Sequence, residues 1–132
     1  MLRRAADELV SLIWCLSKYE DTKQYPDKID IDCLGAVLKQ EKVNRLEVFE
    51  PHLEIMTKLN EIANAFKHSF INSDHSLMGC DEPRIHALAL NYNKLISDPV
   101  FYDVTLRTIV EKYNDFFIGC NSWLKGYSER NR

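Results

Sequence analysis

Glycine and proline are scarce in this chain, where each occurs only four times among 132 residues. So low a content excludes collagen-like and low-complexity chains, in which these residues are abundant. Hydrophobic residues make up 45% of the chain and charged residues 28%, which is ordinary for a globular protein. A chain of this length buries enough surface to hold its own core. We therefore expect one folded domain over residues 1–132.

Closely spaced cysteines are absent as well. The four cysteines lie far apart in the chain, at Cys15, Cys33, Cys80 and Cys120. None of them forms the C-x-x-C pair that metal sites and redox motifs use. The apolar run of a signal peptide is also missing, because Asp7 and Glu8 interrupt the first segment. The sequence therefore predicts reduced thiols in a cytoplasmic protein.

Long apolar runs and an excess of one charge are missing too. No stretch approaches the ~20 consecutive apolar residues of a membrane helix, and the net charge is only −3. Such a charge gives no general attraction to nucleic acid or to anionic membranes. The glycine-rich phosphate loop, the G-x-S-x-G elbow, the H-E-x-x-H helix and the acidic calcium loop do not occur. We expect a soluble protein that needs no cofactor and binds no membrane.

What the chain does contain is helical periodicity. Apolar residues recur three and four positions apart in three long segments, 2–19, 49–70 and 106–127, which predicts one helix in each. A weaker pattern over residues 31–42, which include Gly35, predicts a short helix. The expected fold class is mainly α, as an antiparallel bundle of four or so helices.

Each long helix is expected to bury its apolar stripe. The stripe of the first helix consists of Leu2, Ala5, Ala6, Leu9, Leu12, Ile13, Leu16 and Tyr19. That of the third consists of Ile55, Met56, Leu59, Ile62, Ala63, Phe66 and Phe70. That of the last consists of Leu106, Ile109, Val110, Tyr113, Phe116, Phe117, Cys120, Leu124 and Tyr127. His52 falls on the apolar arc of the third helix, so we expect a packed histidine that is hydrogen-bonded near the start of that helix.

Between residues 84 and 106 the pattern is ambiguous. Apolar and polar residues alternate on both sides of Asp98 and Pro99, which fits two short strands as well as a helix followed by an irregular linker. The second piece, around Val100, Tyr102 and Val104, is rich in the β-branched and aromatic residues that strands favour. The sequence therefore favours a small β-hairpin inserted between residues 84 and 106.

The most distinctive polar residues lie on the third helix. Asn60, Asn64 and His68 are four positions apart and so follow one line on the helix surface, with Lys67 beside it. Such a line could hold a ligand, bind a phosphate through Lys67 and His68, or use His68 as a general acid or base, because imidazole titrates near neutral pH. The alternative is an ordinary solvated helix face.

Residues 59–68, with the sequence LNEIANAFKH, resemble the signature helix of HEPN-type helical-bundle proteins. The family's motif is an arginine, then four to six residues, then a histidine. His68 matches the histidine and Asn64 a polar member of the motif, whereas positions 61–63 hold glutamate, isoleucine and alanine in place of the arginine. The resemblance implies a dimeric helical bundle that acts as a metal-independent ribonuclease, with the histidines of two subunits meeting in a cleft.

Four candidate metal ligands lie within nineteen residues, at His68, His75, Cys80 and His86. Zinc needs about four converging ligands, which short spacings usually hold in pairs. Here the spacings are seven, five and six residues, so separate histidines are the simpler interpretation.

Two functions remain open after these observations. The leading hypothesis is a non-catalytic module that binds a protein or a small ligand and acts as a homodimer. Its subunits would meet through the wide apolar surface of the first or the last helix. In the first helix, Val10 and Trp14 lie beside the apolar stripe and widen it. The alternative is a HEPN-like ribonuclease or toxin-type protein that uses His68, which would bring RNA as a partner.

Overall fold

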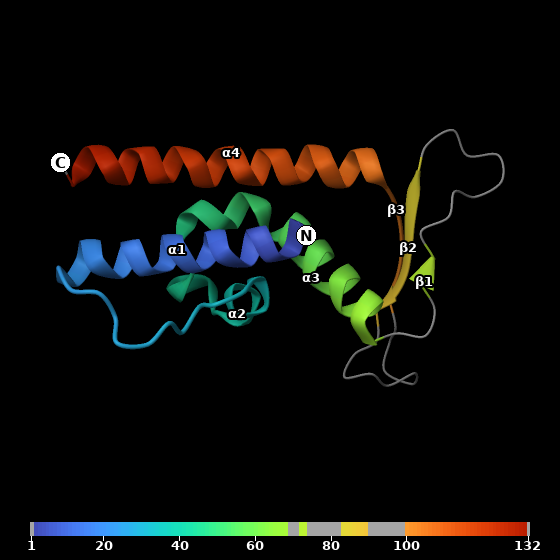
Figure 1. The fold of residues 1–132 in the computed structure, drawn as a ribbon, viewed down its shortest axis with the longest axis horizontal. Coiled ribbons are helices and arrows are strands. Elements are labelled where there is room, and N and C mark those ends of the chain that lie inside the picture. The colour runs from blue at the N-terminus through green and yellow to red at the C-terminus, as the bar shows by residue number, and fades with distance from the viewer. Residues whose placement is uncertain (1, 69–71, 74–82, 90–99, 132) are drawn as a thin grey trace.

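A computed structural model describes residues 2–68, 72–73, 83–89 and 100–131, with the side chains of residues 68, 72 and 73 left out. Four α-helices occur in this part of the chain: α1 (Leu2–Thr22), α2 (Leu34–Lys39), α3 (Leu53–His68) and α4 (Leu106–Arg130). Two 3₁₀ helices, η1 (Lys42–Asn44) and η2 (Glu47–His52), connect α2 to α3. The mainly α fold class is confirmed (Figure 1).

The predicted β-hairpin is also confirmed. Strands β2 (Arg84–Ala89) and β3 (Val100–Thr105) pair antiparallel, with Arg84 opposite Thr105 and Ala89 opposite Val100. A two-residue strand, β1 (Asn72–Ser73), adds to the outer side of β2 in the sheet order β1-β2-β3. This third strand was not predicted, because Asn72 and Ser73 are residues typical of turns.

α1 and α4 lie side by side, α3 runs obliquely to them, and the sheet stands across one end of the pair (Figure 1). α1 and α4 run in the same direction, since Glu20 near the end of α1 accepts a hydrogen bond of 2.6 Å from Nε of Arg130 at the end of α4. α4 begins directly after β3, where the Thr105 hydroxyl accepts a hydrogen bond from the Thr108 amide, 3.1 Å. This is an ordinary N-cap, which supplies an acceptor for an otherwise unpaired helical amide.

The third helix begins later than the expected residue 49. Residues 47–52 form the 3₁₀ helix η2 with Pro51 inside it, and the α-helix starts at Leu53. Proline has no amide hydrogen and disfavours the α conformation of the residue before it. Both effects favour a 3₁₀ turn at this position, with the α-helix starting after the proline. None of the described helices is long and apolar enough to cross a membrane.

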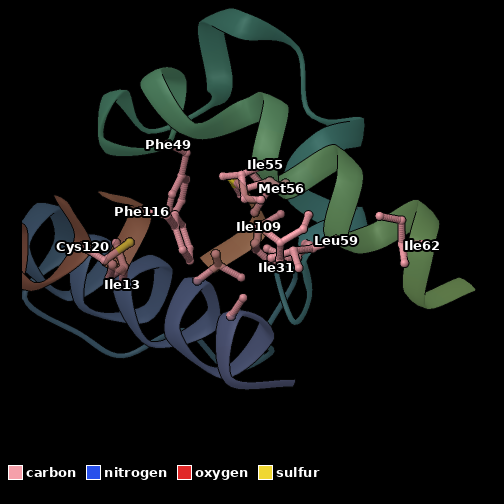
Figure 2. Close-up of a cluster of buried hydrophobic side chains, with 14 of the residues drawn as sticks. Ile13, Ile31, Phe49, Ile55, Met56, Leu59, Ile62, Ile109, Phe116 and Cys120 are labelled. Atoms are coloured by element: carbon pink, nitrogen blue, oxygen red, sulfur yellow. The ribbon is translucent and has the colours of Figure 1, made fainter. Parts of the chain in front are cut away.

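The core lies where η2, α1, α3 and α4 meet (Figure 2). Its fully buried large side chains are Phe49, Phe116, Ile13, Leu34, Met56, Val10, Val37 and Cys120. Figure 2 shows Phe49 of η2, Met56 of α3 and Phe116 of α4 among the buried side chains of this core. Several residues assigned to the core stripes are instead exposed: Leu2, Leu12, Phe66, Leu106, Val110 and Phe117. Their helices turn a neighbouring part of the apolar surface toward the core, so Val10 and Trp14 are buried in α1.

Candidate functional site

The polar line predicted on α3 contacts α1 and is not simply exposed to solvent. Nη1 of Arg3 in α1 donates a hydrogen bond of 2.7 Å to Oδ1 of Asn64. One turn earlier on α3, Oδ1 of Asn60 is buried and has no hydrogen-bond partner among the described atoms. A Cβ added to Gly35 of α2 would lie 3.6 Å from this oxygen. Asn60 and Asn64 therefore occupy the junction of α1, α2 and α3.

Arg3 also connects this line to the start of α2. Its Nε lies 3.7 Å from Oδ2 of Asp7, one turn later in α1. Oδ1 of Asp7 in turn accepts a hydrogen bond of 2.8 Å from the amide of Leu34, the first residue of α2. The residue before it, Cys33, makes no side-chain cap of its own. A carboxylate at this position accepts a hydrogen bond from an otherwise unpaired helical amide. Its negative charge also interacts favourably with the positive end of the helix dipole.

The rest of the predicted line lies toward the end of α3. Lys67 is exposed there. His68 is the last residue of the helix, and its side chain falls outside the described residues. The structure therefore pairs Asn64 with Arg3 of α1 and places Asn60 beside Gly35 of α2. It also places a guanidinium on the line although residues 61–63 contain no arginine.

Of the four predicted metal ligands, only His86 has its side chain among the described residues. His75, Cys80 and the side chain of His68 lie outside the described residues. His86 is in β2 and only 8% exposed, with Nε2 3.1 Å from Oδ1 of Asp103 in β3. No group of three or more acidic, cysteine or histidine side chains in the described segments is placed to hold a metal ion.

Asp103 lies between Arg84 and His86 on one face of the sheet. It accepts a hydrogen bond of 2.7 Å from Nε of Arg84, and this contact is the main reason that the pKa of Asp103 lies below its ordinary value. The ring of Phe101 stacks on His86 with ring centroids 6.1 Å apart. Sequence analysis missed this cluster. Only the hairpin register, which sets His86 opposite Asp103, could have indicated it.

The opposite face of the sheet packs on α3. Ala87 is fully buried there, and the hydroxyl of Tyr102, its partner in β3, donates a hydrogen bond to the carboxylate of Glu61. Burial raises the pKa of Glu61. Glu61 therefore anchors the sheet to α3.

His52 lines a small cavity between α3 and α4. The cavity has a volume of about 140 Å³, and charged residues such as Lys58, Lys112 and Asp115 also line it. The predicted packing of His52 is confirmed, because its ring meets Phe116 edge to face with centroids 5.8 Å apart. Burial lowers the pKa of His52, and the charge of Asp115 opposes this shift.

The outer side of α4 carries large apolar residues in contact with solvent. Leu106, Val110 and Phe117, which we call the α4 strip, are 43% to 49% exposed, and Ile118 beside them is 61% exposed. The three residues of the strip fall within about 40° of the helix circumference, since each residue advances the helix by ~100°. A shallow groove of about 390 Å³ lies where α4 begins, between Pro83, Leu106 and Val110.

Comparison with protein-family models, with curated proteins and with solved structures finds no match to this chain.

Proposed function

We propose that this protein is a binding module that works as a homodimer, with the outer side of α4 as its subunit interface. The observation that carries the proposal is the exposure of the α4 strip and Ile118. Single apolar residues on a surface are common. A row of them along one helix is typical of an interface, because burying apolar area contributes ~25 cal/mol per Å².

The packing of α4 supports this assignment. The neighbouring stripe of the helix, about 80° round from the centre of the α4 strip, is held in the core by Ile109, Phe116 and Cys120, all nearly or fully buried. The helix is therefore fixed before a partner arrives, and little order has to be created on binding. Two-fold symmetric dimers are also the commonest oligomers of soluble proteins.

We further propose that the protein works in the reducing environment of the cytoplasm. The three described cysteines, Cys15, Cys33 and Cys120, carry free thiols. Burial raises the pKa of Cys120 to about 12, so this thiol stays protonated and unreactive at neutral pH.

Replacing Ile118 with glutamate tests the dimer. The change places a charge in the proposed interface but no charge in the core, so the chain should stay folded and become monomeric. Sedimentation velocity over a range of concentrations should give twice the mass of one chain for the wild type and a single-chain mass for Ile118→Glu. The matched control is Val43→Glu, which lies on η1 outside the proposed interface helix and is 86% exposed. A wild type that is monomeric at all concentrations would refute the proposal.

A second candidate function is that of a HEPN-like ribonuclease. The specific observation in its favour is the hydrogen bond from Arg3 to Asn64. A guanidinium recognises phosphate through paired N–H donors, and α1 brings one to the helix that ends at His68. In this candidate Arg3 binds the phosphate of RNA and His68 transfers the proton.

RNA cleavage in the presence of a chelator tests this candidate. A histidine acting as general acid or base contributes about 10² to 10⁴ in rate, so His68→Ala should lose at least a hundredfold of the wild-type activity. His75→Ala is the matched control, since it removes another histidine of the same region, and it should retain activity. Equal residual cleavage by the wild type and His68→Ala would exclude the ribonuclease.

A further inference from the structure

We infer that α4 pairs with α4 of a second copy in antiparallel orientation, with Ile118 next to the two-fold axis. This inference rests on the proposed function, because it requires that the chain dimerises through α4. It adds the direction and the register of the pairing.

The charges along α4 are arranged symmetrically about Ile118. Glu111 lies seven residues before it and Lys125 seven residues after it. Arg107 and Glu129 lie eleven residues before and after it. All four are exposed. With ~100° per residue they fall, together with Ile118, within an arc of about 40°.

In an antiparallel pair centred on Ile118, positions equally far from the centre face each other. Glu111 then meets Lys125 of the partner subunit, and Arg107 meets Glu129 of the partner subunit. Two-fold symmetry repeats each contact, so opposite charges meet at four places. The charge pattern of one α4 helix is thus complementary to the same pattern in an antiparallel copy.

A parallel pair gives the opposite result. There Glu111 would face the same glutamate of the partner and Lys125 the same lysine. Like charges placed across an interface disfavour that arrangement. The charge order therefore selects the antiparallel direction.

The apolar residues fit the same arrangement. The α4 strip is centred about 100° round the helix from Ile118, so it flanks the charged arc on one side. A two-fold axis perpendicular to the helices keeps the strips of both copies on the same side of the contact. Phe117, adjacent in sequence to Ile118, then lies at nearly the same level along the helix as the axis in both copies. α4 forms one long edge of the molecule in Figure 1, which leaves its length accessible to a second helix.

Charge reversal at Glu111 and Lys125 tests the inference. Either Glu111→Lys or Lys125→Glu alone turns two attractive contacts of the dimer into repulsive ones. We expect each single variant to raise the dimer dissociation constant by about tenfold or more at low salt. The double variant exchanges the two charges and should return the constant to within about threefold of the wild-type value.

Sedimentation velocity at low and high salt measures these constants, and circular dichroism verifies that each variant is folded. Salt should reduce the effect of the single variants, because it screens exposed charges. If the wild type is dimeric but the single variants bind as tightly, the antiparallel register is wrong and the proposed dimer stands. Weakened single variants with no recovery in the double variant also overturn the register. A monomeric wild type refutes the proposed function itself.

Discussion

Replacing Phe116 with alanine is expected to lower the free energy of unfolding by about 3–5 kcal/mol. The side chain is fully buried. It contacts the ring of His52 edge to face, and the ring of Tyr113 has its centroid 6.0 Å away. Removing it takes apolar contacts from α4 and η2 at once and leaves a cavity that these helices cannot fill without moving. Urea unfolding at one fixed protein concentration measures the change.

Phe66→Ala is the matched control for this prediction. Phe66 is also helical but 45% exposed, so the same truncation should cost only about 1 kcal/mol. Equal losses in the two variants would mean that Phe116 does not pack in the core as described. A smaller urea dependence of the unfolding free energy would instead indicate a change in the unfolded or native ensemble.

Phe116 also shows how far the sequence determines the fold. The periodicity of apolar residues was sufficient to predict the long helices, and β-branched residues were sufficient to predict the hairpin. On α4, however, two apolar stripes overlap. Ile109, Phe116 and Cys120 form one, and the α4 strip forms the other. Both have helical spacing, so only the position of the neighbouring helices decides which one is buried.

The candidate site was predictable to a similar degree. The line of Asn60 and Asn64 follows from their spacing of four residues. The partner of Asn64 does not, since Arg3 is 61 positions away in the chain and reaches it only through the packing of α1 on α3. The same holds for Asp7, whose bond to Leu34 spans 27 positions. Local patterns therefore place side chains on a helix face but do not identify their partners on other helices.

Gly119→Ala is expected to destabilise the protein by about 1–2 kcal/mol, although alanine favours helices. In an open helical position the change would gain up to ~1 kcal/mol. At position 119 the added Cβ would lie 2.7 Å from Nε2 of His52, closer than non-bonded atoms can approach. The His52 ring already packs on Phe116, so it cannot move away freely. Overpacking of this kind costs about 1–3 kcal/mol, which exceeds the helical gain.

Gly126→Ala in the same helix is the control. Its added Cβ would lie 2.9 Å from Nη1 of Arg130, but this atom is the end of a flexible side chain that can shift toward solvent. The substitution should therefore stabilise the protein by up to ~1 kcal/mol. If Gly119→Ala stabilises the protein equally, His52 does not restrict α4.

A double-mutant cycle then isolates the contact between His52 and Gly119. In the His52→Ala background the space beside residue 119 is open, so Gly119→Ala should stabilise by up to ~1 kcal/mol instead of destabilising. This reversal of sign cannot arise from helix propensity alone, because propensity is the same in both backgrounds. It would show that glycine is required at position 119 by the close approach of η2 to α4.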